Sequence, residues 1–540
     1  MNHGLDLLYP EATLRVARPL IERALVFAFA SGDTAGAFER VLENATLGPS
    51  NFKPESFARD LFLEQFVQRC LPIRIGATTY VPCKPYLTRV LSMPPVRLDA
   101  VEFRQAILSE LGSDRAQRDQ FETLYQSLHE LRGMLSAGDY ATRADQNLRR
   151  LDILRCIHRV FVQMATSHNG AQSALSRIRG TGKRVVESDA FEHLSELLSY
   201  EQHLATVDLR VRLGSDGTVR AFDLLGHREN VGNRFYSNWL GRWWARFEMF
   251  LKGYRFSQHE ILTRLLEQTF EGIRPELSAL FQLLGDMEVY LAMLGFMDAA
   301  EGARLKASLP EWASESSPTT AFSGLYNPFL VAEGVQVQSC DIEARADAIV
   351  VVTGPNSGGK TRLLQSVALS QLLAQGGFPV PAERARLVVR PGLFVSLLDD
   401  IRADQEEGRL GMELVRIRRL FEQINVGDMV VFDELCSGTN PSEGEEIFRL
   451  VVELLGQLHP QIWLTTHFLQ FASRLREGGE PEQLLFLRAK LDAQEHPTFT
   501  FEEGVARTSF ARQTAARLGV TWDELATLVE RAKNREPGSA

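Results

Sequence analysis

The sequence predicts a mostly α-helical region that contains one small β-hairpin, followed by an α/β domain. Three observations lead to this fold class. Apolar residues recur at helical spacing through much of residues 14–165 and again in 238–294. Residues 206–225 instead alternate with a period of two around a Gly-Ser-Asp-Gly turn. Beyond residue 345, short apolar runs end in glycine-rich or acidic segments and alternate with helical patterns, which is typical of an α/β domain.

Length and composition are those of a globular protein with several domains. The chain has 540 residues, of which 44% are hydrophobic and 24% charged, so two to four domains can each bury a core. We find no apolar run long enough to cross a bilayer, and the first residues lack the features of a signal peptide. The cysteines contain no CxxC pair, which favours reduced thiols over a zinc site or a disulfide framework. These features predict a cytoplasmic protein.

The charge is unevenly distributed. The whole chain has 59 Lys+Arg and 69 Asp+Glu, a net charge of −10. Residues 141–260 hold 18 Lys+Arg and 13 Asp+Glu, or +5, which leaves −15 for the remainder. A mildly basic middle section permits a local nucleic-acid surface, although such an asymmetry is more often a solvated helix face.

We expect three regions along the chain. Residues 1–95 alternate helical patterns with loops and include a short β-like piece at 73–81. Residues 96–312 are mainly helical and contain the hairpin. The stretch 313–320 is rich in Ser, Thr and Pro and is the best linker candidate, so the third region begins at residue 321.

Two features of the middle region each have a functional and a structural interpretation. Arg210 and Arg212 lie opposite the apolar face of the hairpin, whereas Arg220 shares its parity with Phe222. These arginines predict either a basic tip that contacts a phosphate backbone or a solvated hairpin face. Aromatic residues between 239 and 256 are interleaved with Arg and Lys, which permits base stacking but at helical spacing more often indicates core packing.

The prediction of nucleotide binding depends on residues 348–369. An apolar run predicts a buried strand, and the residues after 361 predict a helix. Between them lies Gly-x4-Gly-Lys-Thr, a loop whose backbone N–H groups can surround a phosphate. Lys360 would reach the β- and γ-phosphates, and the Thr361 hydroxyl would hold Mg²⁺. The residues predicted to bind the nucleoside triphosphate are Gly354, Pro355, Asn356, Ser357, Gly358, Gly359, Lys360 and Thr361.

Acidic residues and a histidine complete the predicted site. Residues 429–434 form an apolar strand that ends in Asp433 and Glu434. In a P-loop enzyme, Asp433 would hold the Mg²⁺ shell and Glu434 would orient and deprotonate the attacking water. Another apolar strand, 461–466, ends at His467, which we predict to sense the γ-phosphate. Together with Lys360, these residues are the predicted catalytic and metal-binding groups.

These motifs together resemble the MutS family of DNA-repair ATPases, a branch of the ABC class. Residues 353–361 resemble the family motif TGPNMGGK[ST], and residues 378–383 resemble its (F)VPA[ED] turn. Residues 433–444 resemble the motif DE[IL]xxGTxxxEG, and residues 465–468 resemble the motif [AT]TH[YF]. Residues 509–520 resemble the helices that close its ATPase domain. Residues 97–102 match a phrase of its helical lever domain, and the hairpin lies where its DNA clamp would lie.

The resemblance implies an ABC-type P-loop ATPase domain with C-terminal dimerisation helices over 321–540, preceded by a helical lever and clamp over 96–312. It implies a homodimer that sandwiches ATP, with Gly438, Thr439 and Asn440 facing the partner subunit. Where the family has Ser-Thr-Phe, this chain has Gly-Arg-Leu, and we hypothesise that Arg409 makes the contact across the dimer. We expect a branch that lacks the N-terminal mismatch-recognition domain, and no appended nuclease domain is evident.

The expected function is that of an ATP-hydrolysing, DNA-binding clamp of the MutS type in mismatch repair or recombination. Its ligands would be ATP and Mg²⁺, and it would grip duplex or branched DNA by backbone and shape. Additional repair proteins could be partners, and no membrane is expected. Two other functions stay open: an ATPase that acts on a ribosome or another ribonucleoprotein, and a regulatory ATPase that binds no nucleic acid.

Overall fold

The chain folds into two compact units, Met1–Thr46 with Ser109–Glu288 and Leu47–Leu108 with Val289–Ala540. The computed structural model describes residues 5–32, 36–137, 143–202, 207–213, 219–227, 258–314, 316, 318–355, 358–397, 409–435, 440–478, 483–492, 494, 496–506 and 519–533. The two units interleave along the chain, whereas the three regions expected from the sequence follow one another. Helices α5 (Leu98–Ser113) and α11 (Gln258–Gly302) each continue from one unit into the other.

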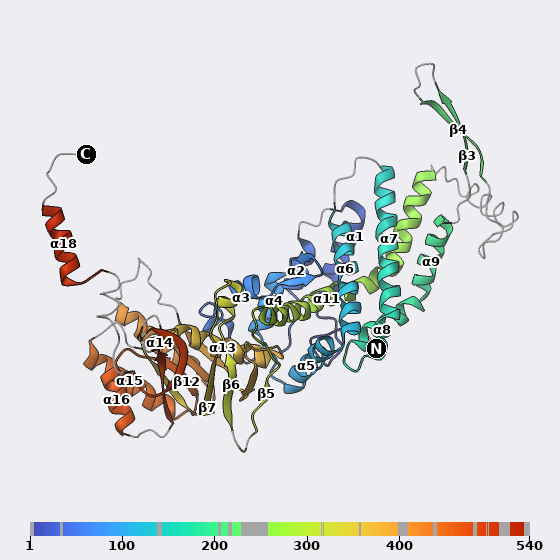
Figure 1. Ribbon diagram of the computed structural model, residues 1–540. Coiled ribbons are helices and arrows are strands. Elements are labelled where there is room, and N and C mark those ends of the chain that lie inside the picture. Colours follow the sequence, from blue (N-terminus) through green and yellow to red (C-terminus); the bar gives the residue numbers. More distant parts are fainter. Residues whose placement is uncertain are drawn as a thin grey trace. The chain divides into compact units, whose positions relative to one another are not determined.

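The first unit is built from helices that pack around the N-terminal part of α11 (Figure 1). Stacked aromatic rings join α11 to the helices that precede it in the sequence. The ring centroids of Phe29 and Phe270 are 3.9 Å apart, and those of Phe38 and Phe281 are 4.2 Å apart. The other helices are α1 (Arg18–Ser31), α2 (Ala37–Glu43), α6 (Arg115–Ser136), α7 (Arg143–Thr166), α8 (Ser176–Val186) and α9 (Asp189–Gln202). Asp114 is the N-cap of α6, and its carboxylate accepts hydrogen bonds from two backbone N–H groups of the first turn.

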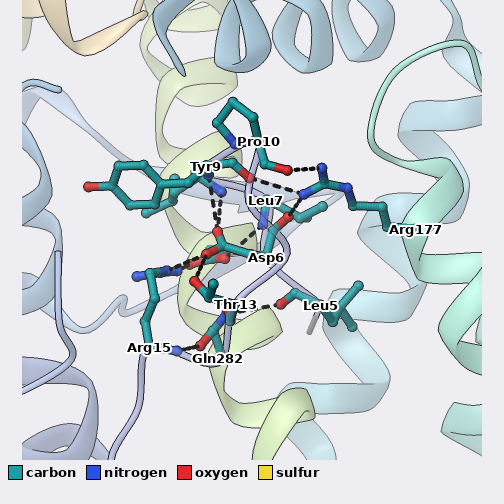
Figure 2. A network of polar contacts seen from close by, with 11 residues as sticks. Leu5, Asp6, Leu7, Tyr9, Pro10, Thr13, Arg15, Arg177 and Gln282 are labelled. Carbon is teal, nitrogen blue, oxygen red and sulfur yellow. Dashed lines mark hydrogen bonds and ion pairs between the residues drawn. The ribbon is translucent and has the colours of Figure 1, made fainter. Parts of the chain in front are cut away.

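The N-terminal segment is anchored by a buried polar network (Figure 2). The Asp6 carboxylate accepts hydrogen bonds from the Leu8 N–H (2.8 Å) and from Arg15 Nε (2.9 Å). Arg15 also pairs with Asp286 of α11, and all three charged side chains are buried. The guanidinium of Arg177 on α8 donates to the backbone carbonyls of Asp6 and Tyr9 at 2.8 and 3.0 Å. The network therefore joins the start of the chain to two helices that lie far away in the sequence.

The predicted hairpin is confirmed at the level of the backbone. Strand β3 (Val207–Leu213) pairs antiparallel with β4 (Val219–His227), with Val211 opposite Phe222 and Arg212 opposite Ala221. The register shifts twice, which marks bulges in this two-stranded ribbon. The side chains of Arg210, Arg212 and Arg220 lie outside the described part of the structure, as do residues 228–257 with most of the aromatic stretch.

The second unit contains the α/β domain that the sequence predicts. Its six-stranded sheet has the order β10-β11-β12-β8-β13-β14, in which the first five strands are parallel and β14 is antiparallel. The strands are β8 (Ile349–Thr353), β10 (Leu393–Ser396), β11 (Met429–Phe432), β12 (Gln461–Thr465), β13 (Leu484–Leu491) and β14 (Pro497–Glu503). Around them lie α13 (Lys360–Gly376), α14 (Arg409–Gln423), α15 (Pro441–Gly456) and α16 (Leu469–Gly478). Strands β8, β11 and β12 are buried along their whole length, as parallel central strands require.

A second sheet in this unit has the order β5-β9-β6-β7. Its strands are β5 (Glu311–Trp312), β6 (Thr319–Leu325), β7 (Cys340–Arg345) and β9 (Arg384–Leu387). Of the expected linker at 313–320, the first six residues connect β5 to β6 and the last two belong to β6, and the whole stretch lies within the second unit. The sequence reading missed this because a two-residue strand leaves no periodic signal.

The remaining elements of the second unit are short. They are η1 (Pro54–Ser56), α3 (Leu63–Cys70), β1 (Ile73–Ile75), β2 (Thr78–Tyr80), α4 (Lys84–Ser92), α12 (Pro328–Ala332) and α18 (Trp522–Lys533). The β-like piece at 73–81 is therefore a small antiparallel hairpin. Helix α11 approaches it closely, because a Cβ on Gly295 would lie 1.8 Å from the carbonyl oxygen of Pro72.

One expectation about membranes requires a correction. Among the described residues, the segment Leu266–Gly302 of α11 is long and apolar enough to cross a bilayer. The apolar window in this segment is 94% buried inside the protein, which is typical of a core helix. Asp286 and Glu288 interrupt its apolar character in the sequence, and both are fully buried in the structure.

Candidate functional site

Three strands bring the predicted site residues to one edge of the six-stranded sheet. Strands β11, β12 and β8 are parallel neighbours, with Phe432 opposite Leu464 and Thr465 opposite Val352. Because the carboxyl ends of parallel strands share an edge, the residues that follow each strand lie together. The glycine-rich loop follows β8, Asp433 and Glu434 follow β11, and His467 follows β12.

The loop after β8 requires glycine for conformational and steric reasons. Gly354 has φ 142° and Gly359 has φ 85°, values that residues with a Cβ rarely adopt. A Cβ on Gly354 would lie 2.8 Å from the Cβ of Ala489 on β13. The N–H of Gly358 donates to the Pro355 carbonyl at 2.9 Å, which closes the turn before α13 begins at Lys360. Asn356 and Ser357 lie outside the described residues.

Lys360 is a buried cation at the N-terminus of α13. Its side-chain Nζ donates to the carbonyl oxygens of Gly354 at 3.0 Å and Pro355 at 3.1 Å. Burial lowers the pKa of Lys360, and the negative charges of Glu434 and Asp433 act in the opposite direction. The amine thus lies within electrostatic reach of both carboxylates and inside the loop that the sequence assigns to the phosphates.

Asp433 lies between two threonine hydroxyls. Thr361 Oγ1 donates to Asp433 Oδ2 at 2.5 Å, and Thr465 Oγ1 donates to Asp433 Oδ1 at 2.5 Å. The first contact joins α13 to the end of β11 across 72 residues of sequence. A carboxylate beside a hydroxyl supplies the oxygen ligands that Mg²⁺ prefers, so the pair predicted to hold the metal is brought together.

Glu434 has an unusual backbone conformation. Its φ is 52°, in the left-handed region that non-glycine residues rarely occupy. Its backbone N–H donates to Thr465 Oγ1 at 2.7 Å. The strand ladder ends one residue earlier, where the Asp433 N–H donates to the Ser396 carbonyl at 2.9 Å. Backbone strain of this kind is often found at functional positions, which supports the predicted role of Glu434.

His467 lies at the end of β12, but its side chain is exposed. Its ring centroid lies 4.2 Å from that of Phe468, at an interplanar angle of 48°. The structure thus brings Lys360, Asp433 and Glu434 into mutual reach, whereas the phosphate-sensing role of His467 stays a prediction.

A cavity of about 350 Å³ adjoins the glycine-rich loop and was not predicted from the sequence. Its walls include Gly359, Lys360 and Thr361 on one side and the aromatic residues Tyr326, Phe499 and Phe501 on another. Phe499 is 51% exposed, and its ring lies beside the loop, since a Cβ on Gly359 would be 3.4 Å from its Cδ1. The sequence signal is the alternation Thr498-Phe499-Thr500-Phe501, which without the fold indicates only a strand.

The residues predicted to face a partner subunit are only partly described. Arg409 begins α14, but its side chain lies outside the described residues, as do Gly438 and Thr439. Asn440 is the N-cap of α15, where its side-chain oxygen accepts the Glu443 N–H at 3.0 Å. That capping bond gives Asn440 a structural role, and its contact with a partner stays a prediction.

Comparison with known proteins agrees with this geometry. Residues 350–534 match the family described as MutS domain V, which is an ATPase domain. The chain is 28% identical over 269 residues to the endonuclease MutS2 of Streptococcus uberis, a match that covers 49% of this chain and 33% of that protein. For the endonuclease MutS2 of Streptococcus pyogenes, the identity is 28% over 262 residues, covering 48% and 32%.

The matched segment therefore spans about a third of each of these relatives. Residues 350–534, which match the domain model, contain the glycine-rich loop and the acidic strand end, and the fold brings these residues together. Residues 350–534 of this chain match MutS domain V, an ATPase domain, and about half of the chain shows distant similarity to the MutS2 proteins.

Proposed function

We propose that this protein hydrolyses ATP at the edge formed by β8, β11 and β12. The observation that carries the proposal is the cluster of Lys360, Asp433 and Glu434 around the start of α13. Lys360 and the first N–H groups of α13 bind the phosphates, because a helix N-terminus and a cation both favour anions. The adjoining cavity accommodates the nucleoside, with Phe499 placed to stack on the base.

The chemistry is divided between two neighbouring carboxylates. Glu434 orients the attacking water and takes its proton as the γ-phosphoryl bond breaks. The Asp433 carboxylate and the Thr361 hydroxyl fit a magnesium ion, because their oxygen atoms lie next to each other and oxygen is the ligand that Mg²⁺ prefers. When bound, Mg²⁺ neutralises the charge on the phosphate oxygens.

We propose further that the protein is a DNA-binding clamp that works as a homodimer. The MutS relationship supports both points, and the exposed apolar residues of α18 support dimerisation. Trp522 is 87% exposed, and Leu528 and Val529 are more than half exposed, a surface suited to a second copy of the chain. Arg210, Arg212 and Arg220 of the hairpin would contact the DNA backbone, and the setting would be cytoplasmic DNA repair or recombination, including mismatch repair.

Substitution of two site residues tests the ATPase proposal. Glu434→Gln should bind ATP with near wild-type affinity but turn it over about 100-fold or more slowly, because the general base is lost. Lys360→Ala should instead weaken ATP binding. Both are measured by phosphate release and by equilibrium binding of a fluorescent ATP analogue. Glu453→Gln, an exposed residue of α15, is the control for the same change of charge, and wild-type turnover in both site variants would refute the proposal.

The DNA proposal is tested by ATP turnover with a panel of nucleic acids. The panel contains plain duplex, mismatched duplex and a four-way junction, with ribosomes in parallel. We expect stimulation by one DNA structure and its loss when Arg210, Arg212 and Arg220 are all changed to alanine. Stimulation by ribosomes alone would favour the ribonucleoprotein function, and no stimulation by any of them would favour a regulatory ATPase.

A further inference from the structure

We propose that Thr465 is the positioning residue that sets the geometry of both carboxylates, an inference that rests on the proposed ATPase function. Its one hydroxyl makes two contacts at the strand ends. Oγ1 donates to Asp433 Oδ1 at 2.5 Å and accepts the backbone N–H of Glu434 at 2.7 Å. A single side chain on β12 therefore fixes the side chain of one acid and the main chain of the next.

The need for this contact follows from the way β11 ends. Asp433 still belongs to the ladder, because its N–H donates to the Ser396 carbonyl of β10. The chain then turns into the left-handed conformation at Glu434, with φ 52°. Such a conformation is unfavourable for a residue with a Cβ and persists only where the surroundings hold it. The Thr465 hydroxyl receives the N–H that has left the ladder.

Burial makes the contact specific to a hydroxyl at this position. Thr465 is fully buried, so water cannot replace the hydroxyl when it is removed. Valine has nearly the same shape and also suits a strand, but it offers neither a donor nor an acceptor. Thr465→Val therefore leaves the Asp433 oxygen and the Glu434 N–H without this partner while preserving the packing of β12.

Thr465 and Thr361 contact different oxygens of the Asp433 carboxylate, Thr465 from β12 and Thr361 from α13. Thr361 follows Lys360 directly at the end of the loop, and its hydroxyl contacts Oδ2 of Asp433, whereas Thr465 contacts Oδ1. Loss of the Thr465 hydroxyl should thus disturb the step that depends on Glu434 more than it disturbs nucleotide affinity. The expected result is a lower kcat with little change in the dissociation constant for ATP.

The experiment compares Thr465→Val, Thr465→Ser and the wild-type protein at full length. We expect kcat to fall about tenfold or more in the valine variant, the ATP dissociation constant to change less than about threefold, and serine to restore most of the rate. Amide hydrogen exchange of the ATP-free protein gives a second readout. The Glu434 N–H should exchange faster in the valine variant and keep its protection in the serine variant.

Thr320→Val is the matched control. Thr320 is a buried threonine on β6 of the four-stranded sheet, and its hydroxyl donates to the side-chain oxygen of Gln461 on β12 at 3.4 Å. It should change neither kcat nor Glu434 exchange. The proposal is overturned if Thr465→Val keeps wild-type kcat, or if kcat and ATP affinity fall together. It is also overturned if serine fails to restore the rate. A wild-type protein without ATPase activity would instead refute the function itself, in which case unchanged Glu434 exchange in the valine variant would also refute the positioning role.

Discussion

The buried network at the N-terminus allows a quantitative prediction about stability. Arg15 lies between two carboxylates, Asp6 and Asp286, and all three side chains are almost or fully inaccessible to water. Arg15→Met keeps most of the aliphatic volume but removes the cation. Two buried acids would then face each other without compensation, which should cost about 3–5 kcal/mol of unfolding free energy.

The network also makes the stability of the first unit depend on pH. The pKa of Asp6 is raised from 3.8 to about 6, mainly because burial disfavours the charged carboxylate. The Asp286 charge also raises this pKa, and the Arg15 charge acts in the opposite direction. Because the folded form holds its proton more tightly than the unfolded chain, stability is greatest below the unfolded pKa and falls as pH rises through the folded pKa. With about 1.4 kcal/mol per unit of pKa, this loss amounts to about 3 kcal/mol between about pH 4 and pH 6. Removal of Arg15 raises the folded pKa further and extends the loss above pH 6.

Urea unfolding followed by far-ultraviolet circular dichroism, at about pH 5 and about pH 8, measures both effects. We expect the penalty of Arg15→Met to be larger at the higher pH. Arg18→Met on α1 is the control, because Arg18 forms an exposed pair with Glu22 that should contribute at most about 1 kcal/mol. A cost for Arg15→Met that equals that of Arg18→Met, or that is the same at both pH values, would show that the network does not work as described.

Three further predictions concern the glycine-rich loop, the adjoining cavity and helix α11. Gly354→Ala should weaken ATP binding about tenfold or more, because the left-handed backbone and the close approach of β13 exclude a Cβ; unchanged affinity in equilibrium binding would contradict this. Phe499→Ala should weaken ATP binding by about 1–3 kcal/mol without changing affinity for inorganic triphosphate, and an equal loss for both ligands would argue against base stacking. In α11, Gly295→Ala should lower the melting temperature because its Cβ would overlap a carbonyl, whereas Gly272→Ala has room and should leave it unchanged or raise it slightly.

The sequence was sufficient where local pattern and chemistry coincide. The strand before the glycine-rich loop and the two apolar strands that end in polar residues agree within one or two residues with β8, β11 and β12. The helix predicted after the loop starts within two residues of α13, but α13 continues to Gly376, seven residues beyond the predicted stretch. The hairpin at 206–225 was also predicted, because alternation and a glycine-rich turn are local signals. Lys360, Asp433 and Glu434 were found because their residue types at those spacings have a defined chemistry with phosphate and metal.

Long-range arrangement was less accessible to sequence reading. The segment 47–108 packs with the ATPase part of the chain, although it lies more than 200 residues before it. The Ser/Thr/Pro-rich stretch at 313–320 was interpreted as a linker, yet it joins two strands of one sheet. Composition records that a segment is turn-forming, but whether its flanks belong to one sheet depends on pairing partners elsewhere in the chain.

Thr465, which lies in the motif at 465–468 but receives no role from the sequence, and Phe499 show the physical limit most clearly. A threonine at the end of a strand and a phenylalanine in an alternating strand are ordinary β residues by propensity. Thr465 gains its importance from Asp433 and Glu434, which precede it by 32 and 31 residues, and Phe499 gains its importance from the loop at Gly359. Residues that act on the ligand can be assigned a role from their type and spacing, whereas the role of residues that hold or complete them can be recognised only once the fold has placed them side by side.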